Sequence, residues 1–75
     1  MRIVNKYTTC PGQRVWVINR KNPDESQTYT AVRHLTEEID PDGNRFAVLH
    51  HDRGETSTFN LAEWKIAISC FIPMW

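Results

Sequence analysis

Five consecutive turn-forming residues, Asp40-Pro41-Asp42-Gly43-Asn44, constrain the fold of this chain more than any other feature of its sequence. Proline suits the first central position of a turn, aspartate and asparagine side chains bind their own backbone, and glycine adopts a positive φ. The flanking segments, 28–39 and 45–50, have the composition of strands. We therefore predict an antiparallel hairpin across 28–50, which the turn His51–Gly54 extends with a third strand at 55–59.

The first strand of this hairpin has a pattern that predicts a bend. Apolar side chains recur on one parity, at Tyr29, Ala31, Leu35 and Ile39, as in a strand with one face on the core and the other in water. Two residues break the pattern, because Arg33 falls on the apolar parity and Val32 on the polar one. A bulge near residues 32–33 would explain both exceptions.

Two further strands are predicted before the hairpin. The segment Arg2–Thr8 is rich in Ile, Val, Tyr and Thr, and the dipeptide Pro11-Gly12 breaks the chain after it. Gln13–Asn19 then carries β-branched and aromatic residues on both faces, as expected for a strand. The polar segment Lys21–Ser26 that follows is interpreted as a surface loop long enough to carry contacts.

The end of the chain supports two different predictions. Asn60 followed by Glu63 resembles the capping box of a helix, and the apolar residues after it lie near helical spacing. The same residues also alternate with period two from Trp64 onward, and most of them favour strands. We favour one short helical turn at 60–63 followed by a strand from Trp64. The alternative is a C-terminal helix over 61–72, which would make the fold α+β.

The chain is thus predicted to be one small domain, 1–75, that is mostly β. Its order of elements resembles the SH3-like small β-barrels. The resemblance rests on Gly12–Val17 as an opening strand, Tyr29–Ile39 as a long bent strand and Phe59–Trp64 as a helical turn before the last strand. It implies a small antiparallel barrel or meander. The segment Thr56–Phe59 does not match the active-site strand of the type II dihydrofolate reductases, so that activity is not carried over.

The length of the chain limits the size of its core. A domain of 75 residues buries only about 60% of the surface that its unfolded form exposes. Eight aromatic residues offset this, because each can bury about 150–250 Å². No secretory signal and no apolar run of about 20 residues is present, so we expect a cytosolic location. In that compartment Cys10 and Cys70 would be reduced, and one bridge between them is the alternative.

The charge of the chain is balanced overall but uneven along the sequence. Six basic and two acidic residues give +4 in 1–35, and three basic and seven acidic residues give −4 in 36–75. A net charge of zero argues against binding nucleic acid through a broadly basic surface. Nucleic-acid binding is nevertheless the alternative function, because basic and aromatic residues fall on predicted neighbouring strands. The residues of this alternative are Arg14, Trp16, Arg20, Lys21 and Arg33.

Metal and catalytic chemistry are disfavoured by the spacing of reactive residues. The three histidines, Asp52 and the two cysteines lack the closely paired ligands of a structural zinc site. His50 and His51 are adjacent, and neighbouring residues on a strand point to opposite faces. No nucleophile–base pattern and no glycine-rich phosphate loop is present. We therefore predict no enzymatic activity, no metal and no cofactor.

Protein binding is the leading hypothesis for the function. The tail 71–75 is apolar, and exposed apolar patches rich in tryptophan often mark partner surfaces. In the other interpretation of the tail, it completes the core. The predicted protein-binding residues are two anchors in the tail and four charged residues of the loop, namely Trp75, Met74, Arg20, Lys21, Asp24 and Glu25.

The kind of partner is suggested only by analogy. Compact chains of this size without enzyme motifs resemble the inhibitors and regulators of host machinery that phages and mobile elements encode. The partner would then be an unidentified host protein. Self-association through a sheet edge or the tail, giving a homodimer, is a further hypothesis.

Overall fold

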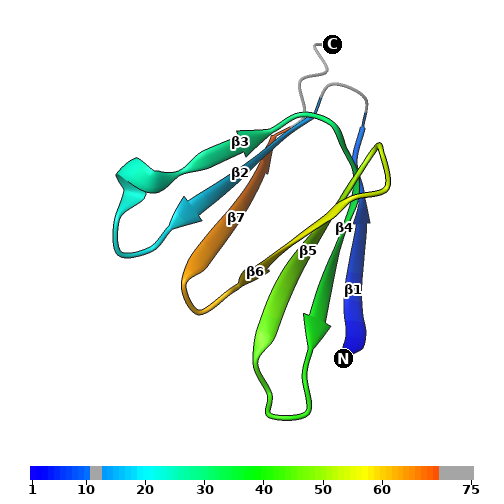
Figure 1. Cartoon of the computed structure of the whole chain (residues 1–75), viewed down its shortest axis with the longest axis vertical. Helices are drawn as coiled ribbons and strands as arrows, with labels where there is room; N and C mark the ends of the chain where they lie inside the picture. The colour runs from blue at the N-terminus through cyan, green and yellow to red at the C-terminus, as the bar shows by residue number, and fades with distance from the viewer. Residues whose placement is uncertain (11–12, 70–75) are drawn as a thin grey trace.

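The computed structural model describes residues 1–10 and 13–69. Seven strands and one short 3-10 turn follow each other along the chain (Figure 1). Their bounds are β1 Arg2–Thr8, β2 Arg14–Asn19, η1 Pro23–Glu25, β3 Gln27–Tyr29, β4 Val32–Ile39, β5 Arg45–His51, β6 Thr56–Asn60 and β7 Trp64–Ser69. The predicted class, mostly β, is confirmed. The predicted break at Pro11-Gly12 lies outside the described residues.

The strands form two antiparallel sheets. Sheet A has the order β1-β4-β5-β6, and sheet B has the order β3-β2-β7 (Figure 1). The predicted three-strand meander is confirmed as β4-β5-β6. Among the described residues no strand pairing joins the two sheets, so they do not close into a barrel. Of the two predicted arrangements, barrel or meander, the chain adopts the meander, with further strands added.

The predicted bend in the long strand is confirmed and turns the chain from one sheet into the other. The segment divides into β3, which belongs to sheet B, and β4, which belongs to sheet A. The register of β4 against β5 shifts between Val32 and His34. This irregularity turns Val32 into the core at 5% exposure and leaves Arg33 exposed. The two exceptions to the apolar alternation therefore have the cause that the sequence predicted.

The turn between β4 and β5 is built around one carboxylate. Asp40 Oδ1 accepts the backbone N–H groups of Asp42 at 3.0 Å and Asn44 at 2.8 Å, and Oδ2 accepts the Asn44 side-chain amide at 3.1 Å. The bonds from Asn44 lower the pKa of Asp40. Gly43 has a φ of 88°, a left-handed conformation that glycine adopts without steric cost. The turn predicted from sequence is therefore the turn that forms.

The end of β6 turns directly into the last strand. Asn60 Oδ1 accepts the Ala62 backbone N–H at 2.9 Å, and the Asn60 carbonyl accepts the Glu63 N–H at 3.0 Å. One hydrogen-bonded turn results, and β7 begins at Trp64. The alternative of a helix over 61–72 is wrong as far as residue 69, because period-two alternation lets β7 pair with β2. Residues 70–72 lie outside the described part.

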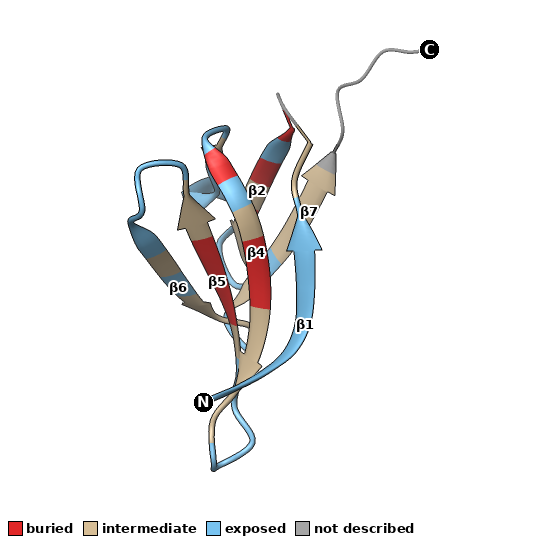
Figure 2. Ribbon diagram, turned by 90° about the vertical axis from the view of Figure 1, so that its right-hand side faces the viewer, coloured by how far each residue is buried: buried red, intermediate tan, exposed pale blue. Residues whose placement is uncertain are grey.

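The core lies between the two sheets. Its buried members come from β2, β4 and β5, and the rings and branched side chains of β3, β6 and β7 pack against them. The buried residues are Val15, Val17, Val32, Leu35 and Leu49, and the half-buried ones around them are Tyr29, Phe59, Trp64, Ile66 and Ile68. Figure 2 shows the buried residues on the central strands, while β1 carries none.

Candidate protein-binding surface

Strand β1 is the most exposed strand of the described chain. Among residues 1–10 and 13–69 it pairs with β4 alone, and all seven of its residues are exposed (Figure 2). The large apolar side chains that the described residues expose all lie on this strand or directly before it: Met1 at 66%, Ile3 at 59%, Val4 at 41% and Tyr7 at 44%. We call these four residues the β1 surface. These exposed side chains are accessible to a partner over the length of a strand.

The local sequence explains both the strand and its exposure. Ile, Val, Tyr and Thr favour extended backbone, so Arg2–Thr8 forms a strand. Its register against β4 shifts between Ile3 and Asn5, which places one extra residue, Val4, in β1. A bulge and a lysine at a sheet edge both hinder unspecific pairing with other strands. With Val4 in the bulge and Lys6 beside it, β1 presents side chains to a partner more readily than its backbone edge.

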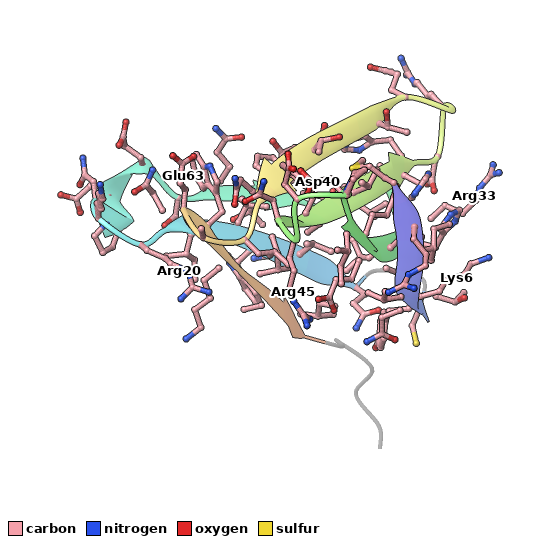
Figure 3. The ribbon with its side chains drawn as sticks, turned by 90° about the horizontal axis from the view of Figure 1, so that it is seen from below. Lys6, Arg20, Arg33, Asp40, Arg45 and Glu63 are labelled. Carbon is pink, nitrogen blue, oxygen red and sulfur yellow. The ribbon has the colours of Figure 1, made fainter. Side chains whose placement is uncertain are left out.

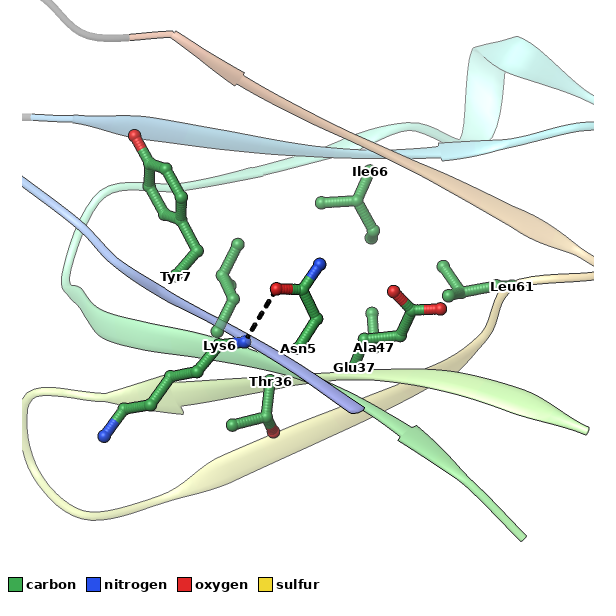
Figure 4. A pocket seen from close by; sticks show the side chains of 9 residues that line it. Asn5, Lys6, Tyr7, Thr36, Glu37, Ala47, Leu61 and Ile66 are labelled. Atoms are coloured by element: carbon green, nitrogen blue, oxygen red, sulfur yellow. Dashed lines mark hydrogen bonds between the residues drawn. The ribbon is translucent and has the colours of Figure 1, made fainter. Parts of the chain in front are cut away.

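A mostly apolar cleft of about 170 Å³ opens beside β1, between the two sheets (Figure 4). Leu35 and Ala47 of sheet A form its floor, and Ile66 of β7 and Leu61 form the opposite wall. The remaining lining residues carry polar groups, namely Asn5, Lys6, Tyr7, Thr36 and Glu37. An apolar hollow with a few polar groups is the usual form of a binding pocket.

The polar groups of the cleft are held in place by neighbours. Glu37 Oε2 lies 2.7 Å from Arg45 Nη1, and the two side chains form an ion pair. Asn5 Oδ1 accepts the backbone N–H of Lys6 at 3.1 Å (Figure 4). The Lys6 side chain points away from the cleft in this view. The cleft therefore offers an apolar floor, and the carboxylate of Glu37 at its rim is paired with Arg45.

Tyr7 connects β1 to the start of β2. Its hydroxyl accepts a hydrogen bond from Gln13 Nε2 at 3.0 Å. Gln13 is only 3% exposed, and its Oε1 accepts the backbone N–H of Cys10 at 2.8 Å. A buried amide that has both ends bonded fixes the ring of Tyr7 at the edge of the cleft. The sequence predicted neither this link nor the β1 surface.

The loop residues predicted for protein binding lie together, at a distance from β1. Arg20 and Lys21 are exposed at the end of β2, and Asp24 and Glu25 are exposed in η1. Figure 1 places this loop at the opposite side of the molecule from β1. Arg20 is tethered, because its Nε donates to the Leu61 carbonyl at 3.1 Å. The other predicted anchors, Met74 and Trp75, lie outside the described residues.

The residues predicted for nucleic-acid binding do not form one surface. Val15 and Val17 are fully buried, so the alternation of β2 turns Arg14 and Trp16 to the outer face of sheet B. Trp16 is half-buried there and does not belong to the core cluster. Arg33 belongs to sheet A, and its Nη2 donates to the Asp52 carbonyl at 3.3 Å.

A basic residue that the sequence reasoning missed joins Trp16. Lys65 of β7 pairs with Ile18 of β2 and is exposed. The strands of sheet B carry no acidic residue between the bounds given above, so their charged residues are all basic. Lys65 lies near Trp16 because β7 pairs with β2, although the two residues are far apart in the sequence.

The three histidines have separate surroundings. As predicted, His50 and His51 point to opposite faces, since His50 Nε2 lies 3.1 Å from Thr36 Oγ1 and His51 Nε2 lies 2.8 Å from Ser57 Oγ. Within 1–10 and 13–69 no three residues of the metal-ligating types are grouped around a common point. Cys10 is half-buried. Its predicted states, reduced or bridged, stay predictions because Cys70 lies outside the described residues.

Comparisons with known proteins give no relative for this chain. No family model matches it, and no match is found among curated proteins or among solved structures. Within the described residues there is no helix of the length and apolar character needed to span a bilayer.

Proposed function

We propose that this chain is a small non-enzymatic protein-binding module whose partner contacts the β1 surface and the adjacent cleft. One observation carries the proposal: the exposed large apolar side chains gather on a single edge strand instead of being scattered. Single exposed apolar residues are ordinary in soluble domains, but exposed apolar residues grouped on one element often mark an interaction site. The bulge at Val4 places Ile3 opposite Glu38 and Tyr7 opposite Leu35, so the strand offers apolar side chains on both of its faces. A partner side chain that entered the cleft would bury itself against Leu35, Ala47 and Ile66.

The partner is proposed to be a different protein. A second copy that paired antiparallel along β1 would bring two lysines, one from each Lys6, onto the same short ribbon. It would also have to accommodate two bulges at Val4. Like charges in close cross-strand positions are destabilising, so a homodimer through β1 is disfavoured. A regulatory role toward host machinery, in the cytosol, extends this proposal by analogy with other small compact proteins.

We also propose that the fold is related to the SH3-like small barrels. The order of β2, the bent pair β3 and β4, then β5, β6, one turn and β7 supports it. Strand β1 would then be an addition to the free edge of β4, in an open variant of that layout.

Binding of single-stranded nucleic acid is the second candidate. The observation that favours it is the half-exposed Trp16 on the outer face of sheet B, with Arg14 on its own strand and Lys65 nearby on β7. Aromatic rings beside cations can stack bases and contact phosphates. Such binding weakens steeply as salt rises, whereas apolar protein contacts at β1 do not.

The proposal is tested by capture from nuclease-treated bacterial lysate with matched variants. The double variant Ile3→Ser/Val4→Ser removes apolar contacts at exposed positions, so the fold is retained. The control, Lys21→Ser/Glu25→Ser, alters the distant loop. We expect the β1 variant to lose a stoichiometric protein that wild type and the loop variant retain. A loss of at least about tenfold in affinity is expected, since burying each side chain contributes about 1.5–3 kcal/mol.

Two results would contradict this assignment. If only the loop variant lost the protein, the partner would bind at the loop residues predicted from sequence. If the recovered material disappeared with nuclease and with rising salt, the outer face of sheet B would be the functional surface. Circular dichroism of both variants confirms that a loss of capture does not reflect unfolding.

A further inference from the structure

A pair of histidines is stacked on the outer face of sheet A. His34 of β4 and His50 of β5 are direct cross-strand partners. Their ring centroids lie 4.1 Å apart, and the ring planes are 17° from parallel. Both side chains are half-buried, and the neighbouring residues Leu35 and Leu49 point to the core instead. The two rings therefore share one outward-facing location that the protein-binding proposal does not use.

The hydrogen bonds of Thr36 determine which ring nitrogen of His50 carries a proton. Thr36 Oγ1 donates its single proton to Glu38 Oε2 at 2.9 Å. The same oxygen lies 3.1 Å from His50 Nε2, so it has to accept there. His50 Nε2 therefore carries hydrogen. Thr36 is only 4% exposed, so its side chain is held in place by its neighbours. Its two hydrogen bonds therefore fix the orientation of the His50 ring.

The surroundings of the pair are mostly basic. Burial lowers the pKa of His34 most, followed by the charges of His50, Lys6 and Arg33. Figure 3 shows the labelled side chains of Lys6 and Arg33 extending outward on the same side of the molecule. Glu38 is the acidic side chain of this face, and it is bonded by Thr36. The nearby Asp52 offers its backbone carbonyl to Arg33.

We propose that Lys6, Arg33, His34 and His50 form a binding site for an oxyanion, such as a carboxylate or phosphate group. The two stacked imidazoles and the two permanent cations lie on three neighbouring strands, and the charges of Lys6 and Arg33 act on His34. A bound anion would offset the repulsion between these groups. The anion favours the imidazolium form of His34, so its binding draws a proton onto the pair. This proposal does not depend on a partner at the β1 surface, although Lys6 lies on the same strand.

The test is an NMR titration of the histidine rings in sulfate and in chloride at equal ionic strength. Sulfate remains a dianion between pH 5 and 8, so any difference arises from the protein. The titration midpoint of His34 is expected to rise in sulfate. By linkage, a tenfold preference of the anion for the protonated form raises it by about one pH unit at saturation. The ring resonances of His51, on the opposite face, are expected to respond alike to both salts.

Variants separate a built site from general screening. Lys6→Gln and Arg33→Gln are expected to reduce the sulfate effect on His34 severalfold, while Lys65→Gln on sheet B leaves it intact. The proposal is overturned by an unchanged His34 midpoint, by an equal response of His51, or by a full effect in both variants. A parallel titration with acetate assigns the class: a response to acetate indicates carboxylates, and a response to sulfate alone indicates tetrahedral oxyanions.

Discussion

Replacing Tyr7 by phenylalanine tests whether its link to Gln13 holds β1 against the rest of the molecule. The substitution removes one hydroxyl and leaves Gln13 Nε2 without its acceptor. Because Gln13 is only 3% exposed, water cannot readily replace that acceptor from its own side. An unsatisfied buried donor costs about 1–3 kcal/mol. The Tyr7 side chain is itself 44% exposed, so water reaches part of the vacated position. We therefore expect Tyr7→Phe to lower the free energy of unfolding by about 1–2 kcal/mol, the lower part of that range.

This loss is large for so small a domain. At about 0.05–0.15 kcal/mol per residue, the whole chain is stabilised by about 4–11 kcal/mol. With a urea m-value of about 1–1.5 kcal/mol/M, the midpoint of unfolding should fall by about 0.7–2 M. The measurement is urea denaturation followed by tryptophan fluorescence. Tyr29→Phe is the matched control, because its hydroxyl donates to the exposed Gln27, and it should change stability by less than about 0.5 kcal/mol.

A second background isolates the hydrogen bond from other effects of the substitution. In a Gln13→Leu protein the buried donor no longer exists, so Tyr7→Phe should then cost less than about 0.5 kcal/mol. The reasoning is refuted if Tyr7→Phe costs the same in both backgrounds, or if it leaves the wild-type midpoint unchanged.

Three further predictions concern the core, a turn and pH. Leu49 is fully buried, so Leu49→Ala should lower the free energy of unfolding by about 2–5 kcal/mol in urea, whereas Val4→Ala at the exposed edge should change it little. Gly54 has a φ of 93°, so Gly54→Ala should cost about 1–2 kcal/mol, seen as a lower melting temperature. Because the pKa of His34 is lowered in the folded state, the unfolded chain binds more protons, and stability should fall as pH drops below about 6.5. Urea midpoints from pH 8 to pH 5 should decline less in His34→Gln; an equal decline would contradict that assignment.

Local chemistry predicted the elements that depend on neighbouring residues. The turn around Asp40 needed only side chains within four positions of it, and its bonds formed as expected. The bend near Val32 was visible because a single irregularity reverses which parity faces the core. The final strand was identified by period-two alternation from Trp64, while the competing helix relied on a weaker spacing signal. In these cases the information lay within one element.

The candidate sites depended instead on pairing between distant segments. Nothing in the sequence of β1 indicates that it joins the edge of β4, or that no other described strand pairs with it. Its apolar residues therefore suggested a strand but no surface. His34 and His50 are stacked because of the register of β4 against β5. Arg33 and Trp16 were grouped by sequence, yet the bend between β3 and β4 sends them to different sheets. Topology therefore determined which side chains share a face.

The central claim, that a partner binds at the β1 surface, is tested most directly by site-specific photo-crosslinking in nuclease-treated bacterial lysate. A benzophenone amino acid placed at the position of Val4 samples the β1 surface, and one at the position of Asp24 samples the distant loop. We predict one prominent protein adduct from position 4 that excess unlabelled wild-type chain abolishes and excess Ile3→Ser/Val4→Ser chain does not. A competed adduct from position 24 alone, or equal competition by the wild type and the variant, would contradict the account.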